Sequence, residues 1–132
     1  MLKIENLTKA YGDKKAVDDL SLHIKSGEIY GFIGHNGAGK TTTLKSVAGI
    51  LRFDGGEIYI DGKSVKTEPI ACKSVTAYIP DNPDLYEFMS GIKYLNFIAD
   101  IFKVTADERR EKINKYAEMF ELTKDLAEPI VS

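Results

Sequence analysis

The sequence predicts a mixed α/β fold, and three observations support this prediction. Apolar and polar residues alternate through residues 1–26, which is typical of antiparallel strands with one face in water. An unbroken apolar run at 29–33 precedes a glycine-rich turn and then a segment with helical spacing. After Ser90 apolar residues recur at helical spacing. We therefore expect an antiparallel β part, a strand–turn–helix unit and a helical part, in this order.

The N-terminal part is expected to form a hairpin, a buried strand and a helix. Two strands flank a turn at Gly12-Asp13. Ile29–Ile33 is apolar throughout, which favours a strand buried on both faces. A helix is predicted from Thr42 to Ala48, and Gly49 is placed to end it. Its core-facing stripe should contain Leu44, Val47 and Ala48.

Two further strands are predicted before the sequence becomes helical. Glu57–Ile60 lies between turn sequences at 54–56 and at Asp61-Gly62. Val75–Ile79 has the apolar character of a second buried strand, and Pro80 would end it.

Two helices are predicted after Ser90. Ser90 is the expected N-cap of Gly91–Phe102, a segment that is apolar almost all round. Thr105 and Glu108 form a capping-box sequence that opens a second helix. The apolar stripe of this helix comprises Ile113, Tyr116, Ala117 and Phe120. Its other face is expected to be solvated and comprises Arg109, Arg110, Glu111, Lys112 and Glu118.

Composition excludes several classes of protein. The 132 residues are 43% hydrophobic and 29% charged, as in an ordinary globular domain. A net charge of −2 offers no basic surface for nucleic acid. The single cysteine cannot form an internal disulfide, which favours a reducing cytoplasm. No apolar stretch approaches the roughly 20 residues of a membrane-spanning helix.

The glycine-rich turn carries the most specific chemical signal in the sequence. Gly34–Thr41 matches the pattern G-x-x-x-x-G-K-[ST] between a predicted strand and a predicted helix. Glycines allow successive backbone N–H groups to point at phosphate oxygens at the positive end of a helix. Lys40 can reach the β- and γ-phosphates, and the Thr41 hydroxyl can coordinate magnesium. The sequence therefore predicts a site for a nucleoside triphosphate.

Several segments together resemble the ATP-binding subunit of ATP-binding cassette (ABC) transporters. The similarity includes 7–12, 16–22 and the phosphate loop with its helix, and continues through 55–58, Asp61-Gly62 and 78–86. This resemblance implies a P-loop NTPase core with an antiparallel β subdomain, followed by the start of a helical subdomain. The expected division is 1–89 for the β subdomain and core, and 90–132 for the helical part. The sequence is then the N-terminal portion of one nucleotide-binding domain.

The resemblance also implies roles for single residues. Tyr11 matches the aromatic residue that stacks on adenine, although a half-buried tyrosine at a strand end is the plain alternative. The residues expected to contact the phosphates are Asn36, Gly37, Gly39, Lys40, Thr41 and Thr42. His35 stands where many relatives have proline, and the favoured interpretation is an exposed loop histidine without a chemical role.

Asp81 stands where the family commonly has a glutamine that helps to hold magnesium and the attacking water. An aspartate keeps an oxygen ligand but is shorter and charged, so a turn-capping role before Asn82-Pro83 stays open. Thr41 and Asp81 are the candidate magnesium ligands, and Asp81 is the one candidate for a catalytic role.

The resemblance implies partners and a location as well. ATP and Mg²⁺ are the expected cofactors. The expected partners are a transmembrane subunit and a second ATP-binding subunit, in a homodimer or heterodimer, at the cytoplasmic face of the membrane. The apolar helix at 91–102 would adjoin the membrane subunit, although core packing explains its aromatic residues equally well.

Two alternatives to a complete transport ATPase follow from the sequence. In the family, the signature loop and the catalytic glutamate come after the position of Ser132. This chain is therefore expected either to bind ATP without hydrolysing it or to be an incompletely folded fragment. It would also expose an apolar strand edge and associate with itself. Another phosphate-loop protein, such as a nucleotide kinase, is the third hypothesis.

Overall fold

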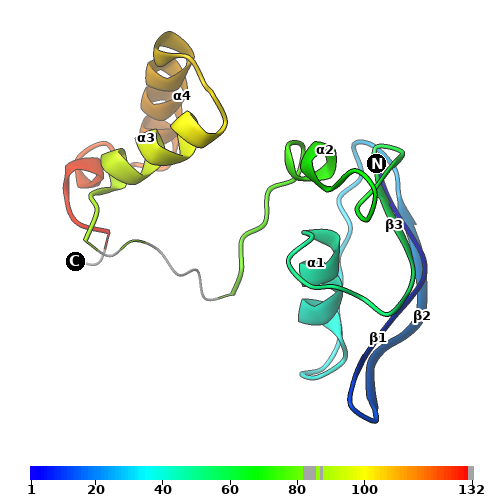
Figure 1. Ribbon diagram of the computed structural model, residues 1–132. Helices are drawn as coiled ribbons and strands as arrows, with labels where there is room; N and C mark the ends of the chain where they lie inside the picture. The colour runs from blue at the N-terminus through cyan, green and yellow to red at the C-terminus, as the bar shows by residue number, and fades with distance from the viewer. Residues whose placement is uncertain (82–85, 87, 131–132) are drawn as a thin grey trace. The chain divides into compact units, whose positions relative to one another are not determined.

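The computed structural model describes residues 1–81, 86 and 88–130. It divides the chain into two compact units, Met1–Tyr78 and Ile79–Ser132. We call them the first and the second unit and describe each by itself (Figure 1). The residues Asn82 and Pro83, which the turn-capping hypothesis includes, lie outside the described residues.

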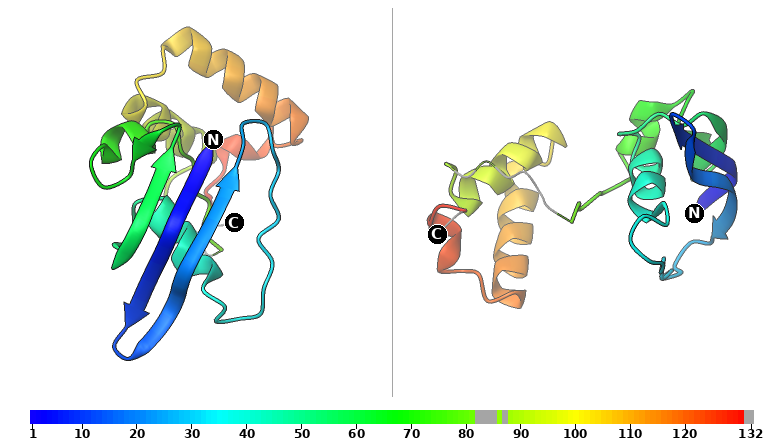
Figure 2. Two further views of the ribbon diagram at one scale, coloured as in Figure 1. Left: turned by 90° about the vertical axis from the view of Figure 1, so that its right-hand side faces the viewer. Right: turned by 90° about the horizontal axis from the view of Figure 1, so that it is seen from below.

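The first unit is built on a four-stranded antiparallel sheet in the order β2-β1-β3-β4. Strands β1 (Leu2–Tyr11) and β2 (Lys14–Ile24) form the predicted hairpin. Strand β3 (Gly55–Ile60) pairs with the other edge of β1, and the Asp61-Gly62 turn leads into β4 (Lys63–Ser64). The central position of β1 is visible in Figure 2.

One helix covers a face of this sheet (Figure 1). Helix α1 (Lys40–Val47) ends before Gly49, as predicted. The core beneath it contains Ile4, Leu7, Val17 and Ile58, and Val47 packs against this cluster.

The predicted inward stripe of α1 is partly wrong. Leu44 is exposed, and the residues that α1 buries are Thr43 and Ser46. Both can be buried because each hydroxyl donates to a carbonyl four residues earlier, Thr43 to Gly39 at 2.9 Å and Ser46 to Thr42 at 2.8 Å.

The two predicted buried strands are also wrong. Ile29–Ile33 and Val75–Ile79 form no strand, and Ile29, Ile33 and Ile79 are almost fully exposed. A buried strand needs hydrogen-bonded neighbours and a covered face. Within the described residues, the sheet consists of β1–β4 alone, so neither segment has a strand to pair with.

A short helix that the sequence pattern did not predict follows β4. Helix α2 (Pro69–Lys73) begins with a proline, which fits the first turn of a helix. It buries Cys72, whose thiol donates to the carbonyl of Lys63 at 3.3 Å. Burial raises the pKa of this thiol.

The second unit contains the two predicted helices, α3 (Gly91–Ile101) and α4 (Ala106–Met119), and a short 3₁₀ helix at Asp125–Ala127. Ser90 is the N-cap of α3, but no side-chain bond accompanies it. Thr105 caps α4 by accepting the backbone N–H of Glu108 at 3.4 Å, as the capping box predicts.

Arg109 was expected on a solvated face, and this expectation is wrong. Its guanidinium donates to Asn96 and Asp100 of α3 and to the carbonyl of Val104, so it joins the two helices. Its Nε is buried without a partner among the described residues.

Candidate functional site

The phosphate loop lies between an exposed segment and the N-terminus of α1. Gly37 and Gly39 both have positive φ angles, 84° and 86°. Gly39 is the N-cap of α1, and Lys40 is its first residue. The loop therefore meets the positive end of a helix, as anion binding requires. The predicted preceding strand is absent from the structure, so this part of the motif's context is not present.

Packing against β2 fixes the end of the loop. A Cβ atom on Gly39 would lie 2.3 Å from the carbonyl oxygen of Ala16 and 3.1 Å from Cγ2 of Val17. Only glycine fits there without a shift of the backbone. At Gly37, by contrast, no heavy atom lies within 4 Å of such a Cβ. The loop is thus held at its helical end and open at its tip.

Lys40 folds back over the loop. Its Nζ donates to the carbonyl oxygens of Gly34 and His35, the second at 2.9 Å. These bonds hold the ammonium at the mouth of the loop, where phosphate oxygens could replace the carbonyls as its partners. His35 is exposed, and its Nδ1 lies 2.9 Å from the carbonyl oxygen of Asn36.

Thr41 and Thr42 follow Lys40 on the first turn of α1. Thr41 is exposed, and none of the described residues forms a hydrogen bond with its hydroxyl, in contrast to the hydroxyls of Thr43 and Ser46. This hydroxyl is therefore accessible to a cation. No group of three histidine, cysteine or carboxylate residues in the described parts of the chain could form a metal centre.

Tyr11 ends β1 in the first unit. Its side chain is 54% exposed, and the Lys9 ammonium lies over the ring, 5.4 Å from the centroid. Lys9 in turn pairs with Asp54 at 3.1 Å. The sequence prediction missed Lys9 and Asp54. Lys9 is two residues before Tyr11 on the same strand, and this spacing could have indicated that it lies beside the ring. Asp54 is 45 residues from Lys9 and directly precedes β3, so no local signal could have indicated it.

Asp81 belongs to the second unit and is exposed. Thr41 belongs to the first unit, so the joint role of the two residues as magnesium ligands stays a prediction.

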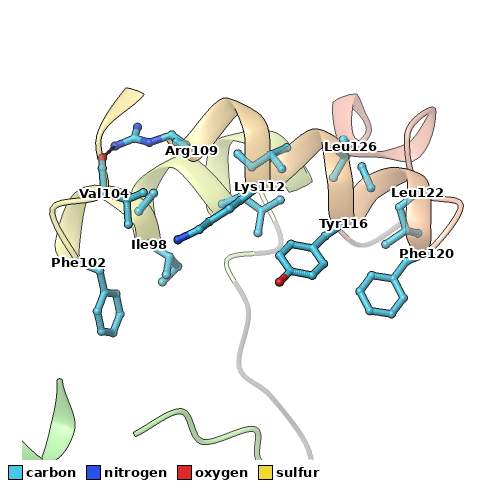
Figure 3. Close-up of a pocket in the computed structure, with 13 residues that line it drawn as sticks. Ile98, Phe102, Val104, Arg109, Lys112, Tyr116, Phe120, Leu122 and Leu126 are labelled. Atoms are coloured by element: carbon cyan, nitrogen blue, oxygen red, sulfur yellow. Dashed lines mark hydrogen bonds between the residues drawn. The ribbon is translucent and has the colours of Figure 1, made fainter. Parts of the chain in front are cut away.

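The second unit has a cavity of about 430 Å³ between α3 and α4 (Figure 3). Its lining is almost entirely apolar, with Arg109 near one end and Phe120 and Leu122 at the other. None of the described residues that line this cavity is a carboxylate, histidine or cysteine, so the phosphate loop is the better candidate site. No helix among the described residues is both long enough and apolar enough to span a bilayer.

Comparisons with known proteins show which proteins this chain is similar to. The family described as "ABC transporter" matches residues 17–131. An uncharacterized ABC transporter ATP-binding protein, YhcH of Bacillus subtilis, is 37% identical over 123 residues, which are 93% of this chain and 39% of that protein. The lipopolysaccharide export system ATP-binding protein LptB of Haemophilus influenzae is 36% identical over 93% of this chain and 52% of its own length.

A solved structure of an ATP-binding subunit of an ABC transporter aligns with a TM-score of 0.89 at 28% identity. The alignment covers 98% of this chain and 54% of that one. The chain therefore spans about half the length of the proteins it matches.

Proposed function

Because this chain belongs to the ABC transporter family, we propose that its first unit binds Mg–ATP and that the whole protein uses ATP to drive a membrane-embedded partner. The observation that carries the proposal is the phosphate loop: positive-φ glycines, the N-terminus of α1 and the Lys40 ammonium converge on one place. The matched relatives are named ATP-binding proteins, which supports ATP as the ligand.

Each residue of the site has a proposed role. The backbone N–H groups around Asn36, Gly37 and Gly39 receive the β- and γ-phosphate oxygens at the helix N-terminus. Lys40 exchanges its two carbonyl partners for phosphate oxygens and neutralises their charge. Thr41 holds Mg²⁺ and Thr42 adds a hydroxyl near the phosphates, while Tyr11 stacks on adenine. Asp81 is the proposed second magnesium ligand.

We further propose that the 132-residue chain alone binds ATP without turning it over. In the family, hydrolysis needs a catalytic glutamate and a signature loop that follow the position of Ser132. A second ATP-binding subunit and a transmembrane subunit would complete the working assembly at the cytoplasmic face of a membrane.

Substitution of Lys40 tests the proposed site. Isothermal titration calorimetry with Mg–ATP should show an affinity about tenfold to a hundredfold weaker for Lys40→Ala, because a charged hydrogen bond contributes about 1.5–3 kcal/mol. Lys45→Ala is the matched control, since Lys45 is an exposed lysine on the last turn of the same helix, and its affinity should be unchanged. Equal affinities for all three proteins would contradict the proposed phosphate site.

A phosphate-release assay tests the proposed inactivity. The purified chain should release no more phosphate than Lys40→Ala. Steady release that Lys40→Ala abolishes would show that this chain contains its own catalytic base.

A further inference from the structure

We propose that Lys9 and Asp54 are positioning residues that fix the ring of Tyr11 and leave one of its faces for the nucleotide base. This inference rests on the proposed function, in which Tyr11 stacks on adenine. It adds two residues that hold the stacking ring but do not contact the phosphates.

Asp54 holds the backbone at the end of β1. Strand β3 pairs with β1 from the Leu2–Ile60 pair to the Thr8–Gly55 pair, and the described residues of β3 extend no further along β1. Beyond this point, Asp54 forms the hydrogen bonds to the backbone of β1. Its N–H donates to the carbonyl of Thr8 at 2.9 Å, and its Oδ2 accepts the N–H of Ala10 at 2.7 Å. The carboxylate thereby replaces a neighbouring strand and holds the residue directly before Tyr11.

The carboxylate of Asp54 also holds the side chain of Lys9. The other oxygen of Asp54, Oδ1, lies 3.1 Å from Nζ of Lys9. Lys9 and Tyr11 are two residues apart on a strand, so their side chains lie on the same face. Lys9 is largely covered, with 15% of its side chain exposed, and its ammonium lies 5.4 Å from the centroid of the Tyr11 ring. One carboxylate therefore fixes both the backbone and the cation beside the ring.

The position of Lys9 leaves one face of the Tyr11 ring for a base. A cation within about 6 Å of a ring centroid is attracted to the face of that ring. With Lys9 over one face, a base can stack only on the other face, and Tyr11 as a residue is 54% exposed. A ring that is already held in one orientation loses less conformational freedom on binding than a free surface tyrosine does. Lys9 and Asp54 should therefore strengthen the base contact and leave the phosphate contacts unchanged.

Two ligands separate a positioning role from a general structural role. We would measure the affinity of the full chain for Mg–ATP and for magnesium inorganic triphosphate, which has no base. Tyr11→Ala should weaken ATP binding about fivefold and leave triphosphate binding unchanged. Lys9→Met and Asp54→Ala should each weaken ATP relative to triphosphate by about twofold to fivefold. Lys9→Arg should retain the ratio, since arginine supplies the same cation.

The charges of these variants provide an internal check. Lys9→Met removes a positive charge and Asp54→Ala removes a negative one, so a general electrostatic effect would change anion affinity in opposite directions. The positioning role changes the ratio of ATP to triphosphate affinity in the same direction for both. Lys66→Met is the matched control, because Lys66 lies over Phe53 at 4.6 Å in another cation–π pair of the first unit. It should not change the ratio.

Combination with Tyr11→Ala completes the test. When the ring is absent, Lys9→Met and Asp54→Ala should cause no further loss of ATP affinity relative to triphosphate. An additional loss of ATP affinity in the Tyr11→Ala background would overturn this inference. An unchanged ratio of ATP to triphosphate affinity in Lys9→Met and Asp54→Ala would overturn it as well, even if the effect of Tyr11→Ala alone supports stacking. If Tyr11→Ala itself left ATP affinity unchanged, the stacking role and this inference would both be wrong. The Lys40→Ala experiment would still test the phosphate site independently.

Discussion

Substitution of Gly39 by alanine tests whether the phosphate loop is anchored on β2 as the structure shows. Two costs arise. At a φ of 86° a Cβ atom crowds its own backbone, which costs about 1–2 kcal/mol. In addition, the new atom would lie 2.3 Å from the Ala16 carbonyl oxygen, and overpacking of this kind costs about 1–3 kcal/mol. Gly39→Ala should therefore destabilise the first unit by about 2–5 kcal/mol.

Gly37→Ala is the matched control for this experiment. Gly37 has nearly the same φ, 84°, but no heavy atom lies within 4 Å of the position of a Cβ. It should therefore incur only the backbone cost of about 1–2 kcal/mol. The difference between the two variants isolates the contact with Ala16.

Amide hydrogen exchange of the β1–β2 hairpin, measured by mass spectrometry across a denaturant series, gives the opening free energy of the first unit without a contribution from the second. Equal losses in the two variants would refute the anchoring of the loop on β2. A stable Gly39→Ala protein that still binds Mg–ATP like the unaltered chain would refute it as well.

Three further predictions concern the packing and charge of each unit. Arg109→Leu should destabilise the second unit by about 1–3 kcal/mol, because it leaves the polar partners of the guanidinium on α3 without their donor, and urea unfolding followed by helix circular dichroism checks this. An unchanged midpoint would contradict that role. Thr105→Ala should cost about 1 kcal/mol through loss of the α4 cap, with Thr105→Ser as the control that keeps the hydroxyl. The N–H of Ala10 and the Lys9 ammonium lower the pKa of Asp54, so its stabilising effect is complete above its unfolded pKa of about 3.9 and is lost as pH falls through the lower folded value. Thermal unfolding of Asp54→Asn should therefore lose part of the acid sensitivity that the unaltered protein shows below about pH 4, and parallel curves for both proteins would contradict this.

Local signals in the sequence predicted the elements that depend on local interactions. The β1–β2 hairpin followed from alternation around Gly12-Asp13, the start of α1 from the phosphate-loop pattern, and the cap of α4 from Thr105 and Glu108. In each case the residues that decide the geometry are close together in the sequence.

The features that the sequence did not predict depend on distant partners. An apolar run such as Ile29–Ile33 indicates a preference for burial, but only neighbouring strands can bury it, and the described residues supply none. Arg109 belongs to a charged sequence that is typical of a solvated helix face, yet its guanidinium donates to Asn96 and Asp100 of another helix. Likewise, no sequence pattern connects Asp54 to Lys9, although the folded sheet places them 3.1 Å apart.

Because Cys72 is buried, the rate at which a thiol reagent modifies it can measure how often the first unit opens. Cys72 is the only cysteine of the sequence, it lies on α2 and is 2% exposed, and its raised pKa further suppresses the reactive thiolate. A thiol reagent can therefore modify the chain only when the first unit opens, and it does so at a single atom. The rate of that one reaction reports opening of the unit that contains the phosphate loop. Because a bound ligand lowers the open population in proportion to its occupancy, slower labelling in the presence of nucleotide would yield a dissociation constant without a reporter group introduced beforehand.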